Sequence, residues 1–358
     1  MAQRDLRYGL IGAGLMGQEH LRNVGSLPGV SFVTVADPHG PSREQADQLL
    51  DPGALVCADY RELLARDDLD AIVIATPNHT HIDVIRDAMA TGKHILCEKP
   101  LCTTIDDARA VAGAVEHYSA VFWVAMEYRY MPPVARLIET VHSGEIGPLK
   151  MLAIREHRFP FLPKVGDWNR FNRNTGGTLV EKCCHFFDLM RLVTCSEPVR
   201  VYASGAQDLN HLDERYEGET PDILDNAFVI VDFENGVRAM LDLCMFAEGS
   251  KNQEEIAATG SRGKVEAFLP SSKVTLASRE SGSAIEVAVP LPEDVGFEGY
   301  HHGSSYVEHV RFRDAILGAG PVEVTAADGL AAVEMGLAAQ RSIATGRPVL
   351  MEELRGEG

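Results

Sequence analysis

The sequence predicts an α/β protein, in which an N-terminal Rossmann domain with a doubly wound parallel sheet precedes a C-terminal α+β domain with an open, mostly antiparallel sheet. Three observations predict this fold. A glycine turn follows the first apolar run, apolar runs then alternate with helical patterns to about residue 125, and later strand patterns have few helices between them. The predicted domains are residues 1–126 and 127–358, with the C-terminal helix able to pack back on the first.

The first apolar run enters the motif Gly12-Ala13-Gly14-Leu15-Met16-Gly17. Gly12 allows the tight turn, Gly14 lets backbone N–H groups approach a pyrophosphate, and Gly17 lets the helix lie close to the strand. Asp37 ends the next apolar run, where a carboxylate accepts hydrogen bonds from ribose hydroxyls. A 2′-phosphate would meet a like charge there, so the pattern favours NAD over NADP. The alternative is a glycine turn without a ligand.

Two further strands are expected to end at the ligand-binding edge of the parallel sheet. The run 70–75 breaks at Thr76-Pro77-Asn78, and His79 to His81 open the next helix. The run 93–97 ends at Glu98-Lys99-Pro100. Pro100 restricts the backbone of Lys99, and such preorganisation suits catalysis. The alternative for Lys99 is a side chain that reaches solvent from a strand end.

After a hinge at residues 127–133, strand patterns dominate. The Asn235-Gly236 dipeptide indicates a hairpin, and helices are expected at 104–117, 134–143, 306–317 and 326–345. The predicted strands of this second domain cover residues 149–155, 199–204, 227–233, 237–246, 254–259, 264–268, 274–278 and 284–289.

Two glycines open a predicted helix over residues 176–191. Glu181, His185 and Asp188 follow at i, i+4 and i+7 and therefore share one helix face. Carboxylates beside an imidazole can make an acid/base site. A metal site is a rival, but no further histidine lies at ligand spacing, so we predict no metal. A half-buried histidine with satisfied hydrogen bonds is the other alternative.

A basic and aromatic stretch precedes that helix. It contains His157, Phe159, Phe161, Trp168 and Phe171 among several arginines, and could stack on the face of a sugar. The alternative is a surface loop with solvated arginines. We expect a substrate with an apolar or second-sugar portion.

Composition limits the possible partners and compartments. A net charge of -19 argues against nucleic acid or an anionic membrane surface as a partner. We find no apolar run long enough for a membrane span and expect no signal peptide, which predicts a cytoplasmic protein. The seven cysteines form no C-x-x-C pair and are expected to be reduced.

Together, these motifs resemble the glucose-fructose oxidoreductase / inositol dehydrogenase / rhizopine catabolism (Gfo/Idh/MocA) family. The resemblance covers nearly the whole chain: the glycine motif, Ala75-Thr76-Pro77-Asn78 with His81, Glu98-Lys99-Pro100-Leu101, Gly176-Gly177 with His185 and Asp188, and Asp328-Gly329-Leu330 near the end. In place of the family's usual aspartate before the histidine, this chain has Glu181, followed by Lys182.

The resemblance implies roles for individual residues. Lys99 would hydrogen-bond the reacting hydroxyl, His185 would act as general base in oxidation and general acid in reduction, and Glu181 would assist as a third catalytic residue. The hydride would go to nicotinamide C4. The implied cofactor-binding residues are Gly12, Gly14, Leu15, Met16, Asp37, Thr76, Pro77, Asn78, His81, Glu98, Lys99 and Glu127. The implied substrate-binding residues are Lys99, Tyr128, Arg129, His157, Trp168, Lys182 and His185.

The implied function is NAD-dependent, reversible oxidation of a secondary hydroxyl of a sugar, glycoside or inositol-like cyclic polyol to a ketone. A homodimer or homotetramer through the C-terminal sheet is expected. Two alternatives stay open: a glycosidase or lyase that uses tightly bound NAD in an internal redox cycle, and a non-catalytic NAD-binding sensor.

Overall fold

The structure is a computed structural model that describes residues 5–293 and 295–356, and the chain divides into two compact units. Unit 1 comprises Met1–Glu127, Pro163–Asn169 and Glu293–Val333. Unit 2 comprises Tyr128–Leu162, Arg170–Pro292 and Glu334–Gly358. The predicted contiguous domains 1–126 and 127–358 stay a prediction.

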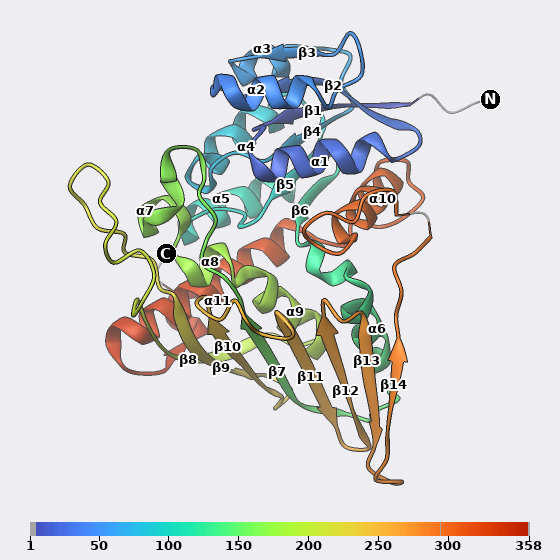
Figure 1. Cartoon of the computed structure of the whole chain (residues 1–358), viewed down its shortest axis with the longest axis vertical. Helices are drawn as coiled ribbons and strands as arrows, with labels where there is room; N and C mark the ends of the chain where they lie inside the picture. The colour runs from blue at the N-terminus through green and yellow to red at the C-terminus, as the bar shows by residue number, and fades with distance from the viewer. Residues whose placement is uncertain (1–4, 294, 357–358) are drawn as a thin grey trace. The chain divides into compact units, whose positions relative to one another are not determined.

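Unit 1 is built on a six-stranded parallel sheet with the strand order β3-β2-β1-β4-β5-β6 (Figure 1). Its strands are β1 (Leu6–Ile11), β2 (Val30–Ala36), β3 (Leu55–Cys57), β4 (Ala71–Ile74), β5 (His94–Glu98) and β6 (Phe122–Ala125). The order reverses between β1 and β4, and ligands bind outside the carboxyl ends of the strands at such a point. The predicted doubly wound Rossmann sheet is confirmed.

Helices cover both faces of this sheet, because right-handed crossovers on either side of the reversal place them on opposite faces. Helix α1 (Leu15–Gly25) packs against α2 (Gly40–Asp47), and α4 (His81–Met89) packs against α5 (Ile105–Val115). A late helix, α10 (Ser304–Ile316), packs on α1. Its Phe312 lies edge-on to the buried rings of Tyr8 and Trp123, at 5.8 and 6.2 Å between centroids. A segment from near the end of the chain thereby completes the core beside the first strand.

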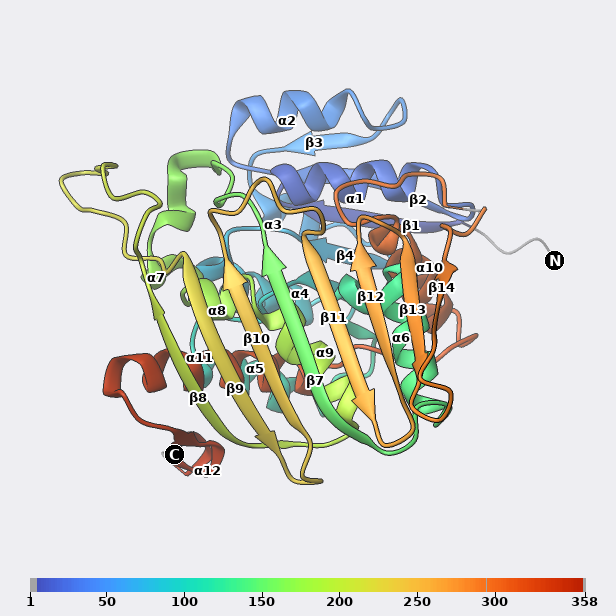
Figure 2. The ribbon, with the colours of Figure 1, turned by 60° about the horizontal axis from the view of Figure 1, so that its bottom comes forward.

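Unit 2 contains a nine-stranded sheet with the order β14-β13-β12-β11-β7-β10-β9-β8-β15, whose strands lie side by side in Figure 2. All neighbours are antiparallel except β7 and β10, which are parallel. The strands are β7 (Leu149–His157), β8 (Pro198–Ala206), β9 (Asn226–Phe233), β10 (Arg238–Cys244), β11 (Glu254–Gly260), β12 (Gly263–Leu269), β13 (Lys273–Ser278), β14 (Ala284–Ala288) and β15 (Val349–Leu350). The mostly antiparallel sheet is confirmed.

The hairpin between β9 and β10 forms at the predicted Asn-Gly dipeptide. Gly236 has a φ of 80°, in the left-handed region that favours glycine, and its N–H donates to the Phe233 carbonyl at 2.9 Å. Local residues define this turn, so the sequence alone was enough to predict the hairpin.

Helices cover one face of the unit 2 sheet. Helix α6 (Pro132–His142) packs on β11, β12 and β13, and α9 (Cys184–Thr194) packs on β7. Exposed apolar side chains lie on the strands at Met151, Tyr202, Phe228, Ile230 and Met240. Paired register positions place all five on a single face, which we call the outer face.

The remaining elements are short, with one exception. They are α3 (Tyr60–Leu64), η1 (Asn78–Thr80), η2 (Glu127–Tyr130), η3 (Val165–Arg170), α7 (Asn172–Thr175), α8 (Thr178–Glu181), α12 (Met351–Arg355) and the long α11 (Ala326–Thr345). Helix α11 has the predicted bounds. The predicted single helix over 176–191 is wrong, because the structure divides this stretch into α8 and α9, with a break at Lys182 and Cys183.

Candidate functional site

The glycine motif in unit 1 has the geometry of a nucleotide cradle. Gly12 has a φ of 95°, and a Cβ there would lie 2.4 Å from the Ala75 carbonyl oxygen. A Cβ on Gly17 would lie 2.1 Å from the Gly12 carbonyl oxygen, so only glycine lets α1 approach β1 this closely. A Cβ on Gly14 would have nothing within 4 Å. This open space at the N-terminus of α1 fits a pyrophosphate.

Asp37 directly follows β2, and its carboxylate links the loop after β1 to the loop after β2. One carboxylate oxygen accepts from the backbone N–H of Ala13, and the other accepts from that of His39, both at 2.7 Å. Each oxygen keeps a second lone pair that can accept from a hydroxyl group. The residues present therefore fit a dinucleotide. Leu15 and Met16 occupy the first turn of α1.

The strand ends carry the other predicted cofactor-binding residues. Thr76 and Pro77 follow β4, and the Asn78 side chain is buried with its Nδ2 donor unpartnered among the described residues. His81 bridges the ends of β4 and β5, with Nε2 3.0 Å from the Thr76 carbonyl oxygen and Nδ1 2.9 Å from that of Pro100. Burial lowers the pKa of His81, although both carbonyls favour the protonated ring. Its ring is fully buried and links the two loops.

Lys99 follows β5, and a buried network supports its backbone. The Glu98 carboxylate accepts from the backbone N–H of Lys99 at 3.1 Å and lies 3.0 Å from His20 Nε2. His20 Nδ1 lies 2.9 Å from Nε2 of His309 on α10. Burial acts to raise the pKa of Glu98, but the hydrogen bond and charge of His20, with Lys99 and His301, lower it. The network thus favours the ionised form of Glu98, whose carboxylate accepts from the Lys99 backbone.

Glu127, at the start of η2, is buried in unit 1 beside a second histidine. His301 Nε2 lies 3.6 Å from Glu127 Oε1, and His301 Nδ1 lies 3.2 Å from Glu19 Oε1. Burial raises the pKa of Glu127, while the charge of His301 opposes that shift. His301 thus links Glu19 on α1 to Glu127 at the start of η2.

In unit 2, the predicted catalytic histidine lies in the first turn of α9. His185 and Asp188 are buried on that helix, whereas Glu181 ends α8. Asp188 accepts from Arg129, whose Nε lies 2.6 Å from Asp188 Oδ2 and whose Nη2 contacts the other carboxylate oxygen. Asp188 therefore forms a two-point ion pair with a predicted substrate-binding arginine.

The side chains of Tyr128 and Lys182 adjoin His185. The Tyr128 ring stacks on the imidazole with 4.0 Å between centroids and 9° between planes. Lys182 Nζ donates to the Tyr128 hydroxyl at 2.6 Å and lies 3.0 Å from Glu156 Oε1. The structure thus gathers four predicted site residues, Tyr128, Arg129, Lys182 and His185, which with Glu156 and Asp188 we call the His185 cluster.

Comparisons with known proteins agree with this architecture. Residues 6–126 match the model described as "Oxidoreductase family, NAD-binding Rossmann fold", and residues 138–351 match "Oxidoreductase family, C-terminal alpha/beta domain". The chain belongs to the Gfo/Idh/MocA oxidoreductase family.

Three relatives illustrate the similarity of this Gfo/Idh/MocA oxidoreductase to known proteins. "Uncharacterized oxidoreductase YrbE" of Bacillus subtilis is 32% identical over 350 residues, or 98% of this chain and 97% of the relative. "Inositol 2-dehydrogenase" of Rhizobium meliloti is 28% identical, over 96% of this chain and 98% of the relative. The solved structure "Levoglucosan dehydrogenase, complex with NADH" has a TM-score of 0.87 at 22% identity, covering 97% of this chain and 99% of that one, and shows the shared fold.

Two further predicted substrate-binding residues of the Gfo/Idh/MocA oxidoreductase have other neighbours. His157 ends β7, where its Nε2 lies 3.0 Å from Asp242 Oδ1, and both side chains are partly exposed. Trp168 belongs to unit 1, where its ring lies edge-on to His79 at 6.2 Å. A substrate-binding role for His157 and Trp168 stays a prediction.

Sequence reasoning missed several buried titratable residues of this oxidoreductase. Glu19, His20 and His309 carried no motif in the sequence. The sequence gives only a weak indication that these residues are buried, because a histidine or glutamate in an amphipathic helix is normally expected on the exposed face. The segment that precedes α10 also brings His301 to Glu19 and Glu127.

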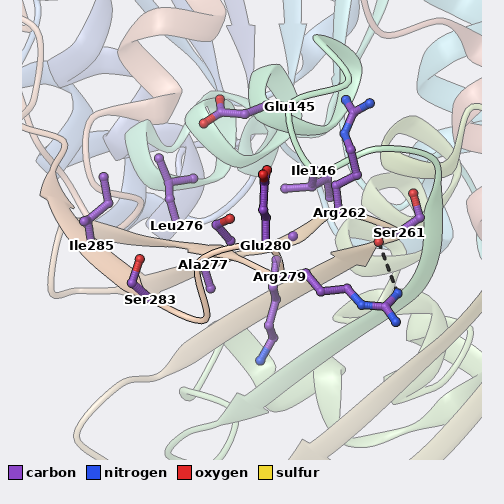
Figure 3. A pocket seen from close by; sticks show the side chains of 13 residues that line it. Glu145, Ile146, Ser261, Arg262, Leu276, Ala277, Arg279, Glu280, Ser283 and Ile285 are labelled. Atoms are coloured by element: carbon purple, nitrogen blue, oxygen red, sulfur yellow. Dashed lines mark hydrogen bonds between the residues drawn. The ribbon is translucent and has the colours of Figure 1, made fainter.

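A hollow of about 700 Å³ in unit 2 lies away from the predicted chemistry (Figure 3). Glu145, Arg262, Arg279 and Glu280 are among its lining residues, and Arg279 Nη1 donates to the Ser261 carbonyl at 3.4 Å. The lining includes none of the predicted site residues.

Within the described part of the chain, no helix is both long and apolar enough to cross a membrane.

Proposed function

We propose that this protein is an NAD-dependent dehydrogenase that oxidises a secondary hydroxyl of a sugar, glycoside or cyclic polyol to a ketone. The observation that carries the proposal is the combination of an NAD-binding Rossmann domain with a buried histidine in a cluster of hydrogen-bonding side chains. Full-length similarity to a protein named inositol 2-dehydrogenase, and fold similarity to one named levoglucosan dehydrogenase, support the substrate class.

The charges of the His185 cluster support a neutral substrate. Arg129 is paired with Asp188, and Lys182 is paired with Glu156, so each of these two cations already has a carboxylate partner within the protein. Recognition of a phosphate or carboxylate usually uses an arginine or lysine held for that purpose. Hydroxyl groups need only hydrogen-bond donors and acceptors, so we infer that a polyol fits this cluster better than a sugar acid or sugar phosphate.

In the proposed reaction each predicted catalytic residue has a defined task. Lys99 donates a hydrogen bond to the reacting hydroxyl oxygen and stabilises negative charge that develops there. His185 takes the hydroxyl proton during oxidation and returns it during reduction, and Glu181 assists it. When bound, NAD⁺ supplies the hydride acceptor. Gly12, Gly14 and Asp37 would hold it, and the carboxylate of Asp37 favours NAD over NADP.

The outer face of the unit 2 sheet supports a proposal of self-association. Phe228 is 61% exposed and Met151 is 59% exposed, and three further apolar residues share their face. A contiguous apolar face of this kind on a folded chain is typical of an interface. We propose a homodimer or homotetramer through this face. Light scattering should then show a smaller species for Ile230→Glu than for the unmodified protein.

Absorbance at 340 nm tests the dehydrogenase proposal directly. The protein would be mixed with NAD⁺ and a panel of inositols, aldoses, glycosides, sugar acids and sugar phosphates, beside Lys99→Ala and His185→Gln controls. Steady NADH formation with a neutral polyol, lost in both controls, is the expected result. Turnover only with a sugar acid or phosphate would overturn the substrate class, and silence across the panel would overturn the proposed reaction.

A further inference from the structure

The plane of the His185 imidazole is set by an aromatic neighbour. Tyr128 lies parallel to it at 4.0 Å, while Phe186 meets the Tyr128 ring edge-on at 5.8 Å and 71°. All three side chains are buried. A ring packed face to face at this distance cannot turn about its χ2 torsion without driving its edge into the neighbouring ring. The orientation of His185 therefore depends on the position of Tyr128.

Lys182 in turn holds Tyr128. Its ammonium donates to the phenol oxygen at 2.6 Å and lies 4.8 Å from the centroid of the same ring. The residue occupies the break between α8 and α9, so its backbone is placed by the ends of two helices. A hydrogen bond at the far end of the phenol and a stack on its face together restrain the ring in two directions.

Buried Glu156 on β7 anchors Lys182. Its Oε1 lies 3.0 Å from Lys182 Nζ and accepts from Arg158 Nη1 at 3.0 Å. Glu254 is paired with Glu156 in the strand register, and burial together with the charge of Glu156 raises the pKa of Glu254. The raised pKa favours a neutral Glu254, which leaves the charge on Glu156 for Lys182 and Arg158. The chain of contacts runs from a rigid sheet to the imidazole.

We propose that Tyr128 and Lys182 are positioning residues for His185, and that Glu156 anchors them, so that the imidazole faces the reacting hydroxyl in a single orientation. This inference rests on the proposed function of His185 in proton transfer. It revises the expectation from the sequence that Tyr128 and Lys182 bind substrate. The contact distances support this role, because both polar ends already hydrogen-bond within the protein. Proton and hydride transfer require correct alignment, and misplacement by about 1 Å can cost about 100-fold in rate.

The kinetic test uses single-turnover mixing, so that the rate of hydride transfer is measured apart from product release. Tyr128→Leu removes the stack and should slow hydride transfer by about 10- to 100-fold, with substrate KM changed by no more than about twofold. Tyr128→Phe keeps the ring and should recover part of that rate. Tyr60→Phe is the matched control, because it removes a phenol hydroxyl that donates to Asp87 on the surface of unit 1, and it should match the unmodified enzyme.

A double-mutant cycle tests the connection between Lys182 and Tyr128. Both Lys182→Met and Tyr128→Phe remove the same hydrogen bond, so the double variant should be no slower than the slower single variant. Additive losses would overturn the proposed chain of contacts. A loss expressed mainly in KM would return both residues to substrate binding.

A spectroscopic measurement separates this inference from the proposed function. Histidines labelled with ¹³C at Cε1 are observed by NMR in the full chain, and the His185 signal is assigned by its loss in His185→Gln. The stacked phenol should shift the signal of the His185 Hε1 proton upfield. Tyr128→Leu should move that signal downfield even if no polyol is oxidised. An unchanged His185 signal in a folded Tyr128→Leu variant would overturn the inference, whereas absence of turnover with the expected signal change would overturn only the proposed function.

Discussion

The contact between α1 and β1 makes Gly17→Ala a sharp test of the cradle. Alanine in an exposed helix usually stabilises relative to glycine by about 0.5–1 kcal/mol. At position 17, however, the new Cβ would lie 2.1 Å from the Gly12 carbonyl oxygen, which is backbone and cannot rotate away. Restoring a normal contact requires α1 to move by about 1 Å, and overpacking of this kind costs about 1–3 kcal/mol. The sign of the usual glycine-to-alanine effect is therefore expected to reverse.

Urea unfolding and NADH fluorescence titration measure the two consequences. Gly17→Ala should lower the free energy of unfolding by about 1–3 kcal/mol and weaken NADH binding by about tenfold or more, because the N-terminal amides of α1 move with the helix. Gly113→Ala is the matched control, because Gly113 lies inside α5 and a Cβ there would have nothing within 4 Å. It should be neutral or stabilising and should leave NADH affinity unchanged. Equal behaviour of the two variants would refute the reasoning.

Three further predictions follow from single contacts. Asp37→Asn loses one of its two carboxylate acceptors, so NADH affinity should fall about tenfold while the NADPH-to-NADH affinity ratio rises; an unchanged ratio in fluorescence titrations would remove Asp37 from cofactor choice. His81→Leu leaves two buried carbonyls without their imidazole partner and should cost about 1–3 kcal/mol in urea unfolding, and a neutral result would argue against the bridge. Burial lowers the pKa of His309, so below pH ~6.5 this histidine binds a proton in the unfolded chain but not in the native protein. The free energy of unfolding should therefore fall from pH 7 to pH 5. Unfolding midpoints measured across this range should depend less on pH in His309→Gln.

Local patterns in the sequence predicted much of the fold. The apolar run ending at Ala75 became β4, the Asn235-Gly236 dipeptide became a hairpin turn, and the periodic stretch 326–345 became α11 with the predicted bounds. These features depend on residues close together in the chain, where side-chain periodicity and turn chemistry act directly. The glycine cradle belongs to the same class, because its residues and its geometry are local.

Contacts between distant segments were not predictable in this way. The pattern at 306–317 predicted a helix, yet only packing shows that α10 adjoins α1 and brings His309 to His20. The same holds for Lys182 and Tyr128, which lie 54 residues apart and meet at 2.6 Å. Periodicity shows which face of a helix is apolar, but it does not identify the element that will cover that face.

The predicted helix over 176–191 illustrates the limit most directly. The spacing of Glu181, His185 and Asp188 predicted one shared helix face. The break at Lys182 and Cys183 instead places Glu181 on α8 and the other two on α9. The sequence by itself determined the cofactor cradle, the strands other than β15 and the candidate histidine, because local residues specify them. Only the tertiary structure decided which side chains surround that histidine, because those partners come from segments whose approach depends on the packing of the whole unit.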